Sequence, residues 1–305
     1  MNPPKPFFYY SAYGLTIKSE LALPALPSIQ NVPQIDVTIL LADLSDAFNR
    51  ENLHKDYWQA SPNNFYMHIT DIEADFHVTN GDTIFIETGR NFTDPDLHMQ
   101  VLGTCMGILA QQRNILPLHA SCISKGNECI IISGQSGSGK STLAMALNKK
   151  GYPLLSDDIC ALHFSEDNLP YVYPTIPQIK IGADSASALG VNTLNLISIF
   201  SKRIVPIDNR STNQRHTIKT IFSIEEGNNN RLKIQELHGA QKMALLAKNT
   251  YTTPEIIKYL GKTSRHFEQC TILAKRYKVK QICRTSSLDN VSDLISTIEN
   301  EFSIA

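Results

Sequence analysis

The sequence has almost no net charge and no long apolar run. Its 28 Lys and Arg residues are balanced by 29 Asp and Glu residues, so the formal net charge at pH 7 is −1. A protein whose main partner is nucleic acid needs a cationic surplus to neutralise phosphates, and this balance argues against that class of partner. The most apolar stretch, Val101 to Leu109, is interrupted by Gly103 and Gly107 and is much shorter than a membrane span. We therefore expect no membrane-spanning segment.

Paired cysteines and a secretory leader are also missing. The six cysteines are scattered, with no C-x-x-C pair and no histidine at metal-ligand spacing. This pattern is typical of reduced, buried thiols and not of a disulfide framework. The opening, MNPPKPFFYYSAYGL, has no basic segment followed by an apolar core. These absences predict a cytoplasmic protein.

The 305 residues leave room for two modest domains, and the pattern changes along the chain accordingly. The first part is rich in strand-like segments with alternating apolar residues, at 7–14, 35–41, 64–70, 73–79 and 82–88. A helix capped by Asp94 or Asp96 follows and is expected to run to about Arg113. Strand, glycine loop, helix and strand then alternate from Leu118, as in an α/β domain. We predict a β-rich N-terminal domain at 1–113 and an α/β domain at 114–305.

A glycine-rich loop is the strongest motif in the sequence. The segment GQSGSGKS fits the P-loop pattern G-x-x-x-x-G-K-S/T, and it lies between the apolar strand CIIIS and the helical segment LAMALNKK. Glycine lets backbone N–H groups approach a polyphosphate, and the following helix directs its positive end at the same anion. In this pattern the lysine reaches the outer phosphates and the serine hydroxyl joins the coordination of Mg²⁺. The predicted nucleotide contacts are Gly134, Gln135, Ser136, Gly137, Ser138, Gly139, Lys140, Ser141 and Thr142.

Two adjacent aspartates follow the loop by sixteen residues, at the end of the short apolar run Leu154-Leu155. Carboxylates at a strand end beside a P-loop are placed to hold Mg²⁺ and to contact the attacking group. Because neighbouring side chains on an extended chain point in opposite directions, Asp157 and Asp158 are expected to do different work. His119 opens the strand before the loop strand, and its spacing alone assigns it no role.

The combination HASCIS, GQSGSGKST and LLSDD resembles the catalytic domain of the bacterial HPr kinase/phosphorylase family, most clearly over 116–164. The resemblance implies a fold of the HPr kinase and phosphoenolpyruvate carboxykinase type, with ATP and Mg²⁺ as cofactors. It also implies that Asp157 handles the proton, that Asp158 binds the metal together with Ser141, and that His119 belongs to the active site.

One segment departs from the family pattern. Where the family has an I-E-I-R-G-type segment, this chain has PQIKIGADSA at 177–186. Lys180 stands at the place of the basic residue, but the glutamate is absent. This weakens the expectation of a second metal contact and of phosphorylase activity. The stretch SKRIVPIDNR at 201–210 offers Lys202 and Arg203 as cations for the transferred phosphoryl group, against the alternative of a solvated basic loop.

The N-terminal half differs from true HPr kinases. Its opening, YSAYGLTIKSELALPAL, resembles the HPr-kinase-like proteins of lasso-peptide biosynthesis, which phosphorylate a serine at the tail of the precursor peptide. We therefore expect an ATP-dependent serine kinase acting on a peptide or small protein, with Asp157, His119, Lys140 and Arg203 as catalytic residues. A true HPr kinase/phosphorylase, a small-molecule kinase and a non-catalytic nucleotide sensor stay open as alternatives, and so does assembly into a homo-oligomer.

Overall fold

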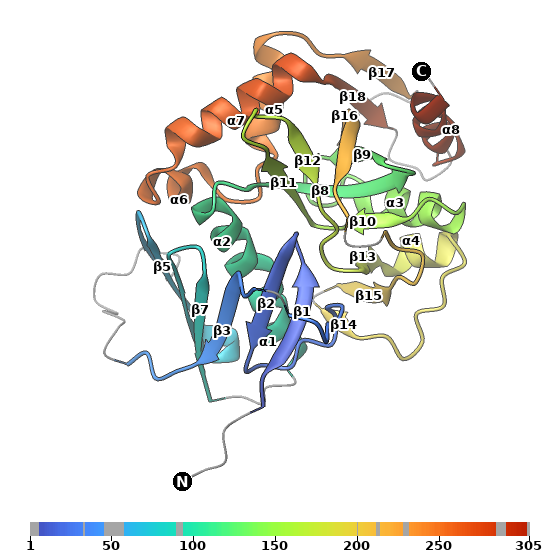
Figure 1. Ribbon diagram of the computed structural model, residues 1–305. Coiled ribbons are helices and arrows are strands. Elements are labelled where there is room, and N and C mark those ends of the chain that lie inside the picture. The colour runs from blue at the N-terminus through green and yellow to red at the C-terminus, as the bar shows by residue number, and fades with distance from the viewer. Residues whose placement is uncertain are drawn as a thin grey trace. The chain divides into compact units, whose positions relative to one another are not determined.

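The computed structural model describes residues 6–32, 34–45, 58–89, 94–199, 201–211, 214–227, 232–284 and 291–303. The chain divides into two compact units (Figure 1). The first consists of Met1–Ile115 and Thr252–His266, and the second of Leu116–Tyr251 and Phe267–Ala305.

A mixed sheet forms the basis of the first unit. Its described strands run in the order β1-β2-β3-β7-β6-β5-β4. They are β1 (Phe8–Ala12), β2 (Leu15–Ser19), β3 (Val37–Leu41), β4 (Trp58–Ser61), β5 (Asn64–Ile69), β6 (Ala74–Thr79) and β7 (Thr83–Thr88), with the 3-10 turn η2 (Thr70–Ile72) between β5 and β6. The strands expected near 35–41, 64–70, 73–79 and 82–88 are confirmed.

The strand predicted at 7–14 is shorter in the structure, where β1 spans Phe8–Ala12. It ends at Ala12 because Tyr13 and Gly14 both have positive φ, at 60° and 71°, and turn the chain directly into β2. Two consecutive left-handed residues are the turn that joins tight hairpins. The strands β2 and β4 were not predicted.

The helix expected after Asp94 is present, with an interruption. Asp94 accepts a hydrogen bond from the Asp96 backbone and caps α1 (Pro95–Gln100). A π-helical turn, η3 (Val101–Cys105), then leads into α2 (Met106–Gln112). The predicted apolar face is buried throughout: Leu97, Val101, Leu102, Cys105, Ile108 and Leu109.

One segment of the predicted C-terminal domain belongs to the first unit instead. The helix α6 (Pro254–Tyr259) packs on β4, where the Tyr259 and Trp58 rings meet edge to face at 5.8 Å. Ile257 and Leu260 are buried in this contact region. The predicted boundary at 113/114 places 252–266 in the second domain. The order of residues along the chain does not reveal that α6, in the C-terminal half, packs against β4 of the N-terminal half.

The second unit is built on a larger mixed sheet, whose described strands run β10-β8-β11-β12-β16-β18-β17 with β9 between β8 and β16. The strands are β8 (Leu116–Lys125), β9 (Glu128–Ser133), β10 (Leu154–Ser156), β11 (Ile159–Phe164), β12 (Pro170–Val172), β16 (His216–Glu226), β17 (Lys233–Glu236) and β18 (Lys278–Arg284). The central strand β16 pairs in parallel with β9 and β18, and the outer pairings are antiparallel. A separate small sheet has the order β13-β15-β14: β13 (Gln178–Gly182), β15 (Lys202–Pro206) and β14 (Ser198–Ile199).

Helices cover both faces of this large sheet. One core contains Ile130, Ile132 and residues of α3 (Lys140–Lys149) and α8 (Val291–Ser303). The other contains Ile131 and residues of α5 (Ala240–Lys248) and α7 (Thr263–Arg276). The short helix α4 (Ala183–Ala188) follows β13. Burial on both faces explains why four consecutive residues of β9, Cys129 to Ile132, are apolar.

Two expectations from composition can be compared with the described chain. All six cysteines are free thiols, five of them buried and Cys283 half-buried. Burial raises the pKa of Cys105 and Cys270, the latter to about 12, so these thiols stay protonated at neutral pH. None of the described helices combines the length and the apolar character that crossing a membrane requires.

Candidate active site

The glycine loop connects the end of β9 to the start of α3, and glycine is required at both of its ends. Gly134 has φ +142°, and a Cβ there would lie 2.3 Å from the carbonyl oxygen of Ile224. Gly139, the residue before the helix, has φ +102°. Gly137 differs from Gly134, because a Cβ would meet no described atom within 4 Å and only its φ of +83° favours glycine. The loop is therefore held close to β16 and turns sharply into α3.

Lys140 is folded back onto this loop. Its ammonium group donates to the carbonyl oxygens of Gly134 at 2.7 Å and Gln135 at 3.0 Å, and the residue is only 6% exposed. Burial lowers the pKa of Lys140 to about 8, although the carboxylates of Asp157 and Asp158 act in the opposite direction. The lysine is charged at neutral pH, and it is already positioned over the backbone that would surround a phosphate.

His119 links this lysine to the acidic pair. Its Nε2 lies 3.1 Å from Lys140 Nζ, and its Nδ1 lies 3.2 Å from Asp158 Oδ1. An ammonium can only donate and a carboxylate can only accept, so the imidazole carries its proton on Nδ1 and accepts through Nε2. His119 thus connects the ammonium of Lys140 to the carboxylate of Asp158.

Asp157 is buried and lies against the P-loop serine. Its Oδ1 accepts hydrogen bonds from Ser141 Oγ at 3.0 Å and Ser121 Oγ at 2.5 Å, and its Oδ2 accepts from the Lys180 backbone at 3.0 Å. Burial raises the pKa of Asp157, and the three hydrogen bonds oppose that shift. The carboxylate and the Ser141 hydroxyl offer adjacent oxygen donors, the kind that Mg²⁺ prefers.

Asp158 faces a different set of partners. Its φ of +77° turns the chain sharply between β10 and β11. Its Oδ2 accepts from Lys180 Nζ at 2.9 Å, and its side chain is 27% exposed. Burial would raise its pKa, but the hydrogen bonds from His119 and Lys180 outweigh it and hold the pKa well below the usual range. Asp158 is the more accessible and the more firmly ionised of the two aspartates.

The two basic candidates of β15 lie on opposite faces of the strand. Lys202 pairs with Gly182, and Gly182 is on the same face of β13 as Lys180. Lys202 is near enough to lower the pKa of Lys140 by charge repulsion. Arg203 alternates with Lys202 and shares its face with Val205, which packs on the core. The structure therefore directs Lys202, and not Arg203, toward the P-loop.

Two further residues of the site had no signal in the sequence. Ser121 lies two residues after His119 on β8, and its hydroxyl donates a hydrogen bond to Asp157. Arg284, at the end of β18, donates to the Ser138 carbonyl at 2.7 Å and to the Gly137 carbonyl at 3.3 Å. Both depend on strand pairing over long sequence distances. No local motif marks either position.

A metal ion at this site would have few ligands from the protein. Among the described residues, no group of three or more His, Cys, Asp and Glu side chains is arranged to hold a metal ion. Asp157 and Ser141 fit a cation whose remaining ligands are phosphate oxygens and water, as in Mg-nucleotide sites. This donor set does not suit a structural zinc ion.

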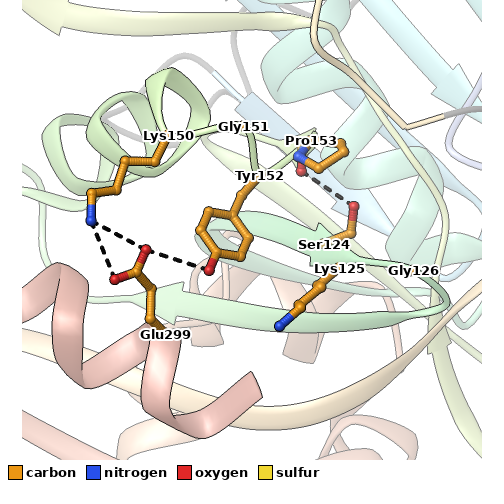
Figure 2. Close-up of a pocket in the computed structure, with 8 residues that line it drawn as sticks. All are labelled: Ser124, Lys125, Gly126, Lys150, Gly151, Tyr152, Pro153 and Glu299. Carbon is orange, nitrogen blue, oxygen red and sulfur yellow. Dashed lines mark hydrogen bonds and ion pairs between the residues drawn. The ribbon is translucent and has the colours of Figure 1, made fainter. Parts of the chain in front are cut away.

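One cavity of the second unit lies away from the P-loop. It has a volume of about 540 Å³ and lies at the opposite end of α3, beside Lys150, Tyr152 and Glu299 (Figure 2). Lys150 and Tyr152 both contact the Glu299 carboxylate there. With ten residues, α3 is about 15 Å long, so this cavity is remote from the acidic pair.

Comparison with known proteins gives limited information. Neither a family model nor a curated protein matches the chain. Among solved structures, the HPr(Ser) kinase/phosphatase from Coxiella burnetii is similar over 61% of this chain and 95% of that chain, with 16% identity and a TM-score of 0.32. The likeness is distant, and it transfers no activity or substrate to this chain.

Proposed function

We propose that this protein is an ATP-dependent kinase that transfers the γ-phosphoryl group to a serine hydroxyl of a peptide or small protein. The observation that supports it best is the convergence of Lys140, Ser141, Asp157 and Asp158 at the N-terminus of α3. Phosphoryl transfer needs little covalent chemistry from a protein, and a site for it consists of cations for the phosphates and carboxylates for the metal and the acceptor.

The loop and its lysines bind the triphosphate in this proposal. Backbone N–H groups of 134–139 surround the β- and γ-phosphates, and Lys140 exchanges its carbonyl contacts for phosphate oxygens. Lys202 adds positive charge from β15 where negative charge develops on the transferred group. Mg²⁺, when bound, neutralises charge on the phosphate oxygens.

The geometry favours exchanging the roles that the family resemblance gave the two aspartates. Asp157 is buried and hydrogen-bonded to Ser141, so we assign it to the cation. Asp158 is more exposed, so we assign it to the acceptor hydroxyl, which it orients and whose proton it accepts. The raised pKa of Asp157 would suit a base, but Asp157 is only 6% exposed, and its carboxylate already accepts hydrogen bonds from Ser121, Ser141 and the Lys180 backbone. In a loose transition state orienting the hydroxyl matters more than basicity.

The seryl oxygen forms a bond to the γ-phosphorus, the bond from that phosphorus to the bridging oxygen breaks, and ADP leaves with the electron pair. The hydroxyl proton passes to Asp158 and then to solvent. His119 holds Asp158 in position from the other side.

We further propose that the acceptor is the C-terminal serine of a lasso-peptide precursor, that the first unit docks it, and that the protein acts in the cytoplasm. Support for docking comes from β5, β6 and β7, where Tyr66 stacks on His77 at 4.0 Å and His77 on Phe85 at 5.7 Å. These three half-buried rings stack in a row on one side of the sheet, because Tyr66 pairs with His77 and His77 with Phe85 across the strands. Such rings are suited to recognising an extended peptide.

The test is phosphorylation of a synthetic peptide that ends in serine, with Mg-ATP and the purified chain. We expect one phosphate per peptide by mass spectrometry and ADP release that depends on the peptide, with no transfer to a peptide ending in alanine. ATP binding without acceptor-dependent ADP release would identify a nucleotide sensor instead. ADP release with a small-molecule acceptor alone would contradict the peptide assignment.

A further inference from the structure

A second cavity in the second unit begins beside the P-loop. It has a volume of about 380 Å³, and the residues that line it belong to α3, to α4 and the residue after it, and to α8. We call it the flank cavity; its walls include Thr142, Ala146, Lys149, Ala188, Val291 and Ile295. Thr142 directly follows Ser141, so the cavity opens next to the residue assigned to the metal.

We infer that the flank cavity holds the base and ribose of the nucleotide. This inference rests on the proposed function, because it requires the triphosphate to lie in the P-loop. The volume falls within the range of small-molecule sites. A nucleotide whose phosphates are anchored at the N-terminus of α3 can lay its nucleoside along the first turns of the same helix.

The lining chemistry fits a flat heterocycle. Ala146 and Ala188 are small and leave room for a ring, while Val291 and Ile295 supply an apolar wall from α8. Apolar walls with a few polar groups at the edge are typical of sites for planar ligands. Ile295 and Ala146 are nearly buried, so a base inserted between them would lose contact with water.

Polar groups stand at the rim. Thr142 Oγ1 donates to Ser185 Oγ at 3.1 Å, and Ser292 adds a second hydroxyl from α8. The charged side chain of the lining is Lys149, whose ammonium donates to the Leu189 carbonyl and has further N–H donors for a ribose or base acceptor. Among the residues that the structure describes, none of those lining the flank cavity is acidic, so none would repel a phosphate-bearing ligand.

The experiment compares ATP with inorganic tripolyphosphate, which has phosphates and no nucleoside, by calorimetry in the presence of Mg²⁺. We expect the wild-type protein to bind ATP about tenfold or more tightly than tripolyphosphate. Ala188→Trp places an indole in the cavity from an exposed position of α4. It should weaken ATP binding about tenfold and leave tripolyphosphate binding unchanged.

Ser187→Trp is the matched control, since it introduces the same indole at the neighbouring exposed residue, which does not line the cavity. It should change neither affinity. If Ala188→Trp leaves ATP binding intact, or weakens ATP and tripolyphosphate equally, the nucleoside lies elsewhere while the proposed kinase function stands. If the wild-type protein binds neither ligand, the proposed function fails and this inference fails with it.

Discussion

Lys140 shows how burial and charge compete at a single residue. Its ammonium is nearly enclosed, yet it donates to two carbonyl oxygens and to His119. Burial of a cation disfavours its charged form, and the neighbouring carboxylates restore part of that loss. The phosphates of a nucleotide would complete the compensation. The residue is therefore suited to a ligand that brings negative charge.

The first prediction replaces Lys140 by methionine, which fills similar space without charge. Nucleotide binding and transfer should fall by about a hundredfold or more, since a positioned cation is lost. The free energy of unfolding without nucleotide should change by no more than about 1 kcal/mol, because relief from burying a charge offsets the lost hydrogen bonds. Calorimetric binding and urea unfolding measure the two effects. A large loss of stability in the free protein would make this lysine structural.

The same variant also tests the lowered pKa of Lys140, because it removes the titrating group. The folded pKa of about 8 lies below the ordinary value of 10.5, so between these pH values the unfolded chain holds more protons at this position. Stability therefore rises with pH in that window, and the cost of burying the charge is fully present below pH 8. Urea unfolding at pH 7.5 and 9.5 should show the wild-type protein gaining stability relative to Lys140→Met. A constant difference would contradict the lowered pKa.

The second prediction separates the two aspartates. Asp157→Asn should raise the Mg²⁺ requirement and be partly rescued by high Mg²⁺ or by Mn²⁺, because it weakens a metal ligand. Asp158→Asn should leave Mg-ATP affinity similar and slow transfer about a hundredfold to ten-thousandfold, the range for a lost acid–base group. Metal titrations of binding and transfer distinguish them. Rescue of the Asp158 variant by metal would restore the roles that the family resemblance implies.

At the scale of the element, strand alternation decides which cation reaches the P-loop. Lys202 and Arg203 are adjacent in β15, and both are plausible from the sequence. Pairing with β13 puts Lys202 on the face of Lys180 and Arg203 on the face of the buried Ile181. A shift of the β13–β15 pairing by one residue would exchange the faces of Lys202 and Arg203.

The third prediction follows from this alternation. Lys202→Gln should lower kcat/KM for transfer about tenfold or more, because a charge that stabilises the transition state is removed. Arg203→Gln is its neighbouring control and should stay within about twofold. Lys202→Gln should also raise the pKa of Lys140, because Lys202 lowers it in the wild-type protein. Equal losses in both variants would show that β15 acts through folding and not through one charge.

At the scale of the whole molecule, each unit is assembled from two separate parts of the chain. The first unit recruits α6 from the C-terminal half, where Ile257 and Leu260 are buried. Removing residues 1–113 would therefore expose an apolar helix. The deletion that respects the structure removes 1–115 and also replaces 252–262, up to the start of α7, by a flexible linker.

The fourth prediction compares these two deletions. The simple deletion should aggregate, because α6 loses its apolar partner. The second should stay soluble and bind ATP with near wild-type affinity, since the P-loop and acidic pair lie wholly in the second unit. It should phosphorylate the acceptor peptide at least about tenfold less efficiently, because the docking surface is gone. Gel filtration, calorimetry and peptide kinetics test the three parts. Unchanged peptide kinetics would remove the docking role.

The sequence by itself determined the local features of this protein. The glycine spacing, the apolar strand before it and the helix after it are consecutive in the chain, so their pattern predicts the loop. The capped helix at Asp94 and most strands of the first unit are local in the same sense. The presence of an acidic pair near the loop was likewise visible from spacing.

Only the tertiary structure decided what these features face. The contacts of Ser141 with Asp157, of Lys180 with Asp158 and of Arg284 with the loop join residues 16, 22 and 146 positions apart. The return of α6 to β4 spans still more of the chain. Such contacts arise from strand pairing and from the burial of apolar faces across the chain, which no short pattern encodes. For that reason the sequence predicted the groups of the site, and the fold assigned them their partners.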